Sequence, residues 1–321
     1  MESFFESLPI WLNLLFFVFG VGAVIKGASW FTDGSVGIAD ATGIPKIFVG
    51  ATIVSLATTT PEISVSWIAA YLRHPETSVG NAVGSTICNI GLILAVASAI
   101  QGVKIPRMTV RVHGAFMLLA GVVLVFLSFD GQLGRQEGFL LLVGTVFFLW
   151  VMVRQSGWES GGGSLENEPN DWGNITRNFF LGGLCVVGGS ILIVQNATIF
   201  ARAAGVSELL IGLTLVALGT SLPELITAVS SSLRGHGDIA VGNVVGANVL
   251  NITLVLGGAA FIVPLKIERQ MFVLDFPVML SLMGLLLLLA VLRGKVGRVG
   301  GLIFISIYAV YLFFLVAFFS A

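Results

Sequence analysis

Charged side chains are scarce in this sequence. Only 10% of its 321 residues are Asp, Glu, Lys or Arg, whereas 56% are hydrophobic, and an average soluble domain has about 25% charged residues. This composition excludes a soluble globular domain and predicts an all-α integral membrane protein. The 16 Lys and Arg residues nearly balance 17 Asp and Glu, so no basic excess is available to bind the phosphates of a nucleic acid.

Cysteine is equally scarce. Cys88 and Cys185 are the two cysteines, and both lie inside apolar runs, which favours small buried thiols and implies neither a disulfide framework nor a thiolate metal site. The amino terminus reads Met1-Glu2-Ser3 and lacks the basic stretch of a cleaved signal peptide. We therefore expect the first apolar run to be kept as a membrane span.

Long apolar runs dominate the chain, and each is long enough to cross a bilayer at about 20 residues per crossing. There are ten, at residues 10–30, 45–72, 79–101, 108–128, 137–154, 177–197, 207–233, 240–263, 271–292 and 299–319. They predict ten transmembrane helices.

One long polar stretch, Ser156 to Asn174, separates the first five runs from the last five. It predicts a division into a first repeat (1–155), a linker (156–174) and a second repeat (175–321). Its acidic residues are candidates for a regulatory cation site, but the spacing of a calcium-binding loop is missing, so a solvated tether is favoured.

Lys and Arg residues are distributed unequally between the two ends of the predicted spans. One side holds eleven: Lys26, Lys46, Lys104, Arg107, Arg111, Arg154, Arg177, Arg234, Arg293, Lys295 and Arg298. The other side holds five: Arg73, Arg135, Arg202, Lys266 and Arg269. Because cytoplasmic loops carry the excess, we expect a cell (inner) membrane protein with a cytoplasmic linker and both termini outside.

The two halves are copies of each other. At an offset of 162 residues, 45–105 aligns with 207–267 without a gap, and about a third of the pairs are identical. The second and seventh runs are both broken by proline, at Pro61-Glu62 and Pro223-Glu224. Five helices per half is an odd number, which predicts two inverted repeats with a substrate site at the broken helices.

Each broken span carries a carboxyl group near its middle, Glu62 in one repeat and Glu224 in the other. A charge at the bilayer centre costs on the order of 3 kcal/mol, and no Lys or Arg lies in the motifs 50–62 and 212–224. Neutralisation then requires protons or a bound cation. Proline cannot donate a hydrogen bond, which frees carbonyl oxygens near Ala57 and Gly219. Hydroxyl groups one turn earlier add oxygen ligands: Thr58, Thr59, Thr220 and Ser221.

The following spans add a polar stripe. Asn81, Ser85 and Asn89 recur at every fourth residue, and the repeat mates are Asn243, Ala247 and Asn251. We expect Asn81 and Asn243, which begin their spans, to be structural, and Asn89 and Asn251 to be ligands. Six or seven oxygens suit calcium better than magnesium, and without thiolates or clustered histidines a softer metal is a poor fit.

These residues resemble the cation/calcium exchanger superfamily, and within it the compact prokaryotic sodium/calcium antiporters, whose repeats contain G-T-S-L-P-E. Residues Gly219 to Glu224 match that motif fully. The resemblance implies a cluster that takes one calcium or several sodium ions as cargo, with no cofactor and no enzymatic activity. The ligands that it implies are Glu62, Glu224, Thr58, Thr59, Thr220, Ser221, Ser85 and Asn89, with the carbonyl groups of Ser55 and Ala217.

Three positions depart from the family pattern. The first repeat reads Ala57-Thr58-Thr59-Thr60 where Gly-Thr-Ser-Leu is usual, Ala247 replaces a serine, and Asn251 stands where some members have aspartate. The last two changes remove a hydroxyl and a third carboxylate. An exchange of three sodium ions for one calcium therefore rests on the resemblance alone.

The sequence thus predicts a secondary active antiporter that exchanges cytoplasmic calcium for external sodium by alternating access. A proton/calcium exchanger would use the same glutamates, and an intramembrane hydrolase or a passive channel is a more remote alternative. His74 and His236 are repeat mates; they are candidate pH sensors, but solvated loop positions are the favoured interpretation. The sequence does not predict the oligomeric state.

Overall fold

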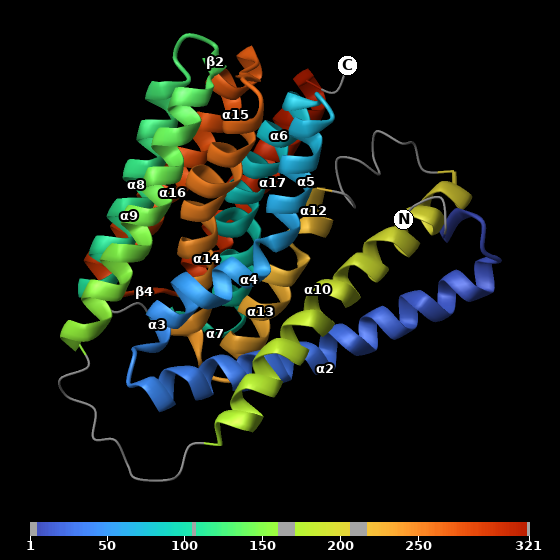
Figure 1. Ribbon diagram of the computed structural model, residues 1–321, viewed down its shortest axis with the longest axis vertical. Helices are drawn as coiled ribbons and strands as arrows, with labels where there is room; N and C mark the ends of the chain where they lie inside the picture. Colours follow the sequence, from blue (N-terminus) through green and yellow to red (C-terminus); the bar gives the residue numbers. More distant parts are fainter. Residues whose placement is uncertain (1–4, 105–106, 160–170, 206–216, 320–321) are drawn as a thin grey trace.

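The computed structural model describes residues 5–104, 107–159, 171–205 and 217–319, and helices occupy most of these ranges (Figure 1). The first half contains α2 (Ile10–Thr42), α3 (Lys46–Val49), η1 (Gly50–Val54), α4 (Ser55–Thr58), α5 (Thr60–Tyr71), α6 (Pro75–Cys88), η2 (Asn89–Leu94), α7 (Ala95–Gln101), β1 (Val103–Lys104), α8 (Arg107–Leu127), β2 (Gln132–Leu133) and α9 (Arg135–Glu159). The second half contains α10 (Trp172–Ala203), α12 (Ala217–Thr220), α13 (Leu222–Leu233), α14 (Gly237–Leu250), η5 (Asn251–Leu256), α15 (Gly257–Ile262), β3 (Leu265–Lys266), η6 (Met271–Asp275), α16 (Phe276–Arg293), β4 (Lys295–Val296) and α17 (Arg298–Phe319). The elements labelled η are π-helical segments within longer helices.

Seven helices of the described residues are long and apolar enough to cross a membrane: 10–42, 75–101, 135–155, 172–203, 237–262, 271–293 and 298–318. An eighth span is the pair 46–58 and 60–71, bent by 45°. The predicted break in the second span is therefore present. The span predicted over 207–233 lies partly outside the described residues, as does most of the predicted linker, so the ten-span arrangement stays a prediction.

The helical run from α14 to α15 forms the centre of the protein. In its apolar window 94% of the residues are buried inside the protein, against 17% in α17. Glycines on α14 let it lie directly against the broken span of the first half, since a Cβ at Gly242 would come within 2.9 Å of the Ala51 amide nitrogen. The neighbouring Gly246 faces the Ser55 side chain in the same way. The outer helices instead expose large apolar side chains, which suits a surface facing lipid.

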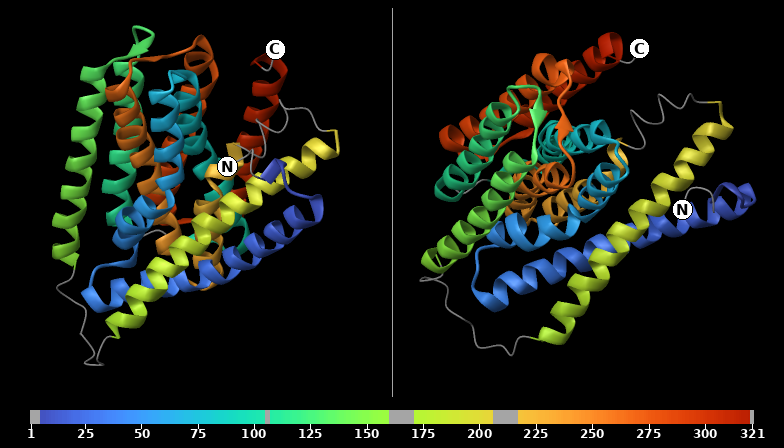
Figure 2. Two further views of the ribbon diagram at one scale, coloured as in Figure 1. Left: turned by 45° about the vertical axis from the view of Figure 1, so that its right-hand side comes forward. Right: turned by 45° about the horizontal axis from the view of Figure 1, so that its top comes forward.

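α2 and α10 form a separate crossed pair that lies diagonally across the remaining helices (Figure 2). Glycine makes this close crossing possible. A Cβ at Gly20 would lie 3.0 Å from the carbonyl oxygen of Gly189, and a Cβ at Gly189 would lie 2.8 Å from the carbonyl oxygen of Gly20. Gly27 and Gly182 meet in the same reciprocal manner. Gly20 and Gly182 are repeat mates, as are Gly27 and Gly189.

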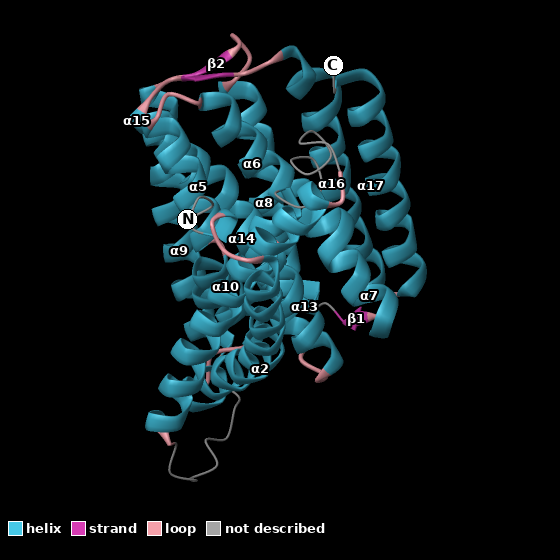
Figure 3. Cartoon of the chain, turned by 90° about the vertical axis from the view of Figure 1, so that its right-hand side faces the viewer, coloured by secondary structure: helices cyan, strands magenta, loops and turns pink. Residues whose placement is uncertain are grey.

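Two short antiparallel ribbons join the halves at opposite ends of the bundle (Figure 3). β1 pairs with β4, with Val103 opposite Val296, and β2 pairs with β3, with Leu133 opposite Leu265. The 162-residue offset converts β1 into β3, and an offset one residue longer converts β2 into β4. Exchanging the repeats therefore maps the ribbon at one end onto the ribbon at the other.

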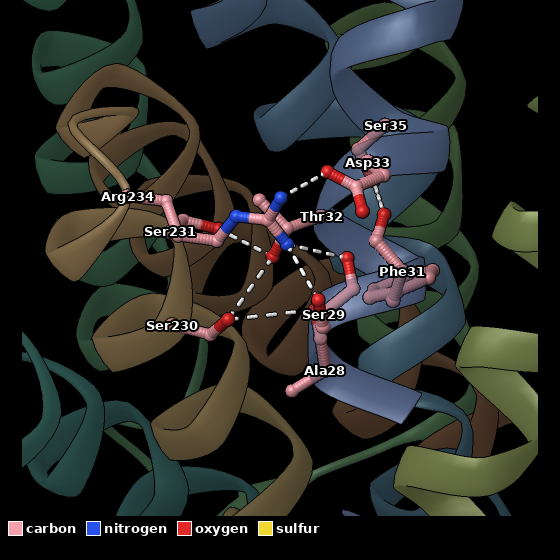
Figure 4. A network of polar contacts seen from close by, with 9 residues as sticks. All are labelled: Ala28, Ser29, Phe31, Thr32, Asp33, Ser35, Ser230, Ser231 and Arg234. Atoms are coloured by element: carbon pink, nitrogen blue, oxygen red, sulfur yellow. Dashed lines mark hydrogen bonds and ion pairs between the residues drawn. The ribbon is translucent and has the colours of Figure 1, made fainter. Parts of the chain in front are cut away.

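A polar clamp joins the end of α13 to α2 (Figure 4). The Arg234 guanidinium donates hydrogen bonds to the Ser29 carbonyl oxygen at 2.9 Å and to the Ser29 hydroxyl at 2.8 Å, and it forms an ion pair with Asp33. Beside it, the hydroxyls of Thr32 and Ser231 lie 3.4 Å apart. The clamp connects the crossed pair to the helix that begins at Pro223-Glu224.

Candidate functional site

Both broken spans place a glutamate in the first turn of a new helix. Thr59 separates α4 from α5, and Ser221 occupies the same position between α12 and α13. The proline that follows each of them has no amide proton. Glu62 and Glu224 then lie at helix amino termini, where the helix dipole stabilises negative charge.

Both glutamates are buried, each with 1% of its surface exposed. Among the described residues, no Lys or Arg forms an ion pair with either one. Burying a carboxylate without a partner costs several kcal/mol, so the pair requires a positive charge from outside the chain.

The two repeats exchange hydrogen bonds at this point. Thr59 donates from its hydroxyl to Glu224 Oε1 at 3.3 Å, and its repeat mate Ser221 donates to Glu62 Oε1 at 3.3 Å. From the spacing of three residues on a helix, each of these hydroxyls is expected on the same side as the glutamate of its own repeat. The bend at Thr59 instead directs its hydroxyl toward the glutamate of the other repeat.

A second pair of hydroxyls makes a matching exchange. Thr58 donates to Asn243 Oδ1 at 3.1 Å, and its repeat mate Thr220 contacts Asn81 Oδ1 at 3.3 Å. Asn81 also donates to the Glu62 carbonyl oxygen at 3.3 Å. The two asparagines expected to be structural therefore lie directly behind the candidate ligands.

Several oxygen atoms of the cluster are buried without a hydrogen-bond partner: Glu62 Oε2, Glu224 Oε2, Asn89 Oδ1 and Asn251 Oδ1. Leaving a buried polar atom unsatisfied costs about 1–3 kcal/mol. Oxygen donors of this kind are the ligands of hard cations such as calcium and sodium. No group of three or more His, Cys, Asp or Glu side chains forms a metal site in the described ranges, so this donor set must draw on hydroxyl, amide and carbonyl oxygens.

The cluster is not fully symmetric. Ser85 donates to Glu62 Oε1 at 3.4 Å and accepts from Ser221 at 3.1 Å, whereas its repeat mate Ala247 has no hydroxyl to offer Glu224. Asn89 donates to Asn248 Oδ1 at 2.9 Å. Sequence reasoning missed Asn248, because the offset pairs it with Thr86, which lies outside the polar stripe.

The two backbone positions implied by the family resemblance differ in how far they are described. The Ser55 carbonyl oxygen accepts hydrogen bonds from the Thr59 amide at 2.9 Å and the Thr58 hydroxyl at 3.3 Å. Ala217 is the first residue of α12, and its surroundings fall outside the described residues.

Cavities reach the cluster between different helices. One of about 220 Å³ lies between α2, α10 and α4 and is lined by Ala57 and Thr58. Another of about 370 Å³ is lined by Asn81, Ser85 and Thr220. Apolar helices here surround a cluster of buried oxygen atoms, and cavities reach that cluster. This arrangement is typical of a membrane ion transporter.

Comparison with known proteins gives the family. The family model described as "Sodium/calcium exchanger protein" matches residues 12–154 and 177–317. The chain belongs to this family, and its homologues are transporters and not enzymes, which excludes the intramembrane hydrolase.

Individual relatives extend over most of the chain. The inner membrane protein YrbG of Escherichia coli (strain K12) is 38% identical, covering 74% of this chain and 76% of that protein. The sodium/calcium exchanger MaX1 of Methanosarcina acetivorans is 29% identical, covering 94% of this chain and 98% of that protein. A solved structure of the sodium-calcium exchanger NCX_Mj, soaked with Na⁺ and Ca²⁺, superposes with a TM-score of 0.84 at 30% identity, covering 96% of this chain and 98% of that one.

Proposed function

We propose that this protein exports calcium from the cytoplasm in exchange for sodium, by alternating access at the cluster around Glu62 and Glu224. The observation that carries the proposal is the reciprocal contact between repeats, Thr59 to Glu224 and Ser221 to Glu62. It brings two buried carboxylates into one cluster, where a single divalent cation would neutralise both.

Calcium and sodium would compete for the same oxygens. The proposed ligands are the side chains of Glu62, Glu224, Thr58, Thr59, Thr220, Ser221, Ser85, Asn89 and Asn251, with the carbonyl groups of Ser55 and Ala217. Two negative charges match one Ca²⁺ or two Na⁺, so occupancy by either ion leaves the buried cluster close to neutral. Both ions are transported substrates in this proposal, which includes no resident cofactor.

The proposed architecture is two inverted repeats of five spans, 1–155 and 175–321, joined by the cytoplasmic linker 156–174. The two ribbons support the inversion, because exchanging the repeats interchanges the ends of the bundle. The reciprocal glycine contacts of α2 and α10 support the same two-fold relation. The excess of Lys and Arg supports a cell-membrane orientation with both termini outside.

The experiment is calcium uptake into sodium-loaded proteoliposomes. Glu62→Gln and Glu224→Gln each remove one charge with little change in shape, and we expect either change to abolish uptake. Glu76→Gln is the matched control, because Glu76 lies exposed at the start of α6 and its pair with His74 is solvated. Uptake that persists in either site variant would contradict the proposal.

The same vesicles distinguish the alternatives. Replacing sodium by choline while imposing a pH gradient should stop calcium uptake if sodium is the coupling ion. Uptake driven equally well by the pH gradient would identify a proton/calcium exchanger. Calcium flux without any counter-ion would identify a passive channel.

A further inference from the structure

A third buried carboxyl group lies outside the cluster. Asp275, the last residue of η6, is 2% exposed. Its Oδ1 accepts a hydrogen bond from the Tyr311 hydroxyl at 2.7 Å, and its Oδ2 is buried without a hydrogen-bond partner. No ion pair formed by the described residues includes it.

The carboxyl group shares a cavity with the central cluster. The cavity of about 370 Å³ that touches Asn81, Ser85 and Thr220 is also lined by Asp275 and Tyr311. Asp275 lies near the beginning of the 271–293 span. That span follows the ribbon β2–β3, which lies at the opposite end of the bundle from the ribbon β1–β4 (Figure 3). Asp275, the fifth residue of its span, therefore lines the same cavity as three polar side chains at the cluster, Asn81, Ser85 and Thr220.

The first repeat has no such carboxyl group. The repeat mate of Asp275 is His113 on α8, which is 1% exposed and has two ring nitrogens without hydrogen-bond partners. The His113 ring packs edge-on against Phe48, with the centroids 4.9 Å apart. The duplicated fold thus accepts an imidazole ring in place of a carboxyl group at this position, so an acid here is not a requirement of the helix packing.

We propose that Asp275 and Tyr311 form a second cation site, which binds one sodium ion on the path to the central cluster. One carboxylate carries one negative charge, which a monovalent cation cancels, whereas a divalent cation would leave an excess positive charge in the membrane. The Tyr311 hydroxyl holds Oδ1, the Gln270 side chain also lies against the carboxyl group and lines the cavity, and Oδ2 is left to bind the ion. The role of this site on the transport path rests on the proposed function, but its occupancy is measurable independently of transport.

The test is a count of bound sodium. Purified protein in detergent, free of calcium, is equilibrated with ²²Na⁺, and the ions bound per chain are measured for the wild type and for Asp275→Asn. We expect the variant to bind about one sodium ion fewer, because amide replaces carboxylate at nearly unchanged shape. Asp130→Asn removes the same charge from an exposed turn and should leave the count unchanged.

Tyr311→Phe is a second variant that keeps the carboxylate and removes its positioning donor. We expect half-saturation of the weaker sodium site to rise about tenfold, the equivalent of one hydrogen bond to a charged group. Calcium-dependent thermal stabilisation without sodium shows that each variant is folded with an intact central cluster. A sodium count and sodium affinity unchanged in the folded variants would overturn the proposal, as would a change confined to the pH dependence of binding. Failure of the antiporter assignment is distinguishable, because the wild type would then show no sodium-driven calcium uptake.

Discussion

The contact between repeats predicts that each hydroxyl supports the carboxylate of the opposite half. Thr59→Val removes the hydroxyl that donates to Glu224 and keeps the branched shape. Hydrogen bonds to charged groups contribute about 1.5–3 kcal/mol. The distance of 3.3 Å exceeds the usual range for two oxygens, so the lower value applies. About 1.4 kcal/mol corresponds to tenfold, and we expect the calcium concentration for half-maximal uptake to rise by about that factor.

The assay is ⁴⁵Ca²⁺ uptake into sodium-loaded proteoliposomes over a range of calcium concentrations. Ser221→Ala removes the matching donor to Glu62 and should give an effect of similar size. Thr60→Val is the control, because the Thr60 hydroxyl donates at 3.1 Å to the Leu56 carbonyl oxygen on the exposed side of the helix. An unchanged half-maximal concentration in Thr59→Val, or an equal rise in Thr60→Val, would refute a role for the Thr59 hydroxyl at Glu224.

Two further predictions concern stability. Gly189→Ala should lower the midpoint of thermal unfolding in detergent, because its Cβ would lie 2.8 Å from the Gly20 carbonyl oxygen, and such overpacking costs about 1–3 kcal/mol. Gly188→Ala is the control, because its Cβ would meet nothing within 4 Å, and it should leave the midpoint unchanged. Equal effects of the two variants would contradict the close crossing of α2 and α10. Partial burial, followed by the charge of Lys46, lowers the pKa of His236 below its usual value. The His236 imidazole thus binds a proton less readily in the folded state than in the unfolded state. The free energy of unfolding should therefore fall as the pH decreases through the usual histidine pKa of about 6.5. His236→Gln should reduce that fall in a thermal unfolding series, and an unchanged pH dependence would contradict the assignment.

Much of the fold and the centre of the site follow from the sequence. The gapless repeat located both breaks, and the breaks located Glu62 and Glu224, because proline interrupts a helix by a local covalent effect. The burial of both glutamates follows from their position within long apolar runs. These features depend on residues close together in the chain, and the sequence pattern contains them directly.

Contacts between repeats were harder to predict. Helical spacing placed Thr59 beside Glu62, but the 45° bend at the break turns it toward Glu224, and the sequence gives no value for such an angle. Asp275 was visible as an acid inside an apolar run. The repeat comparison did not select it because its mate is His113. Residues that only one half possesses leave no mark in the repeat pattern.

The clamp between α13 and α2 is such an unshared feature. The repeat mates of Arg234 and Asp33 are Leu72 and Gln195, which cannot form an ion pair. If the two halves exchanged conformations, the Arg234–Asp33 ion pair would be lost, and no ion pair could form at the equivalent positions of the other half. In the alternating-access cycle proposed above, we therefore expect the balance between inward and outward exposure to depend in part on residues that do not contact the transported ions.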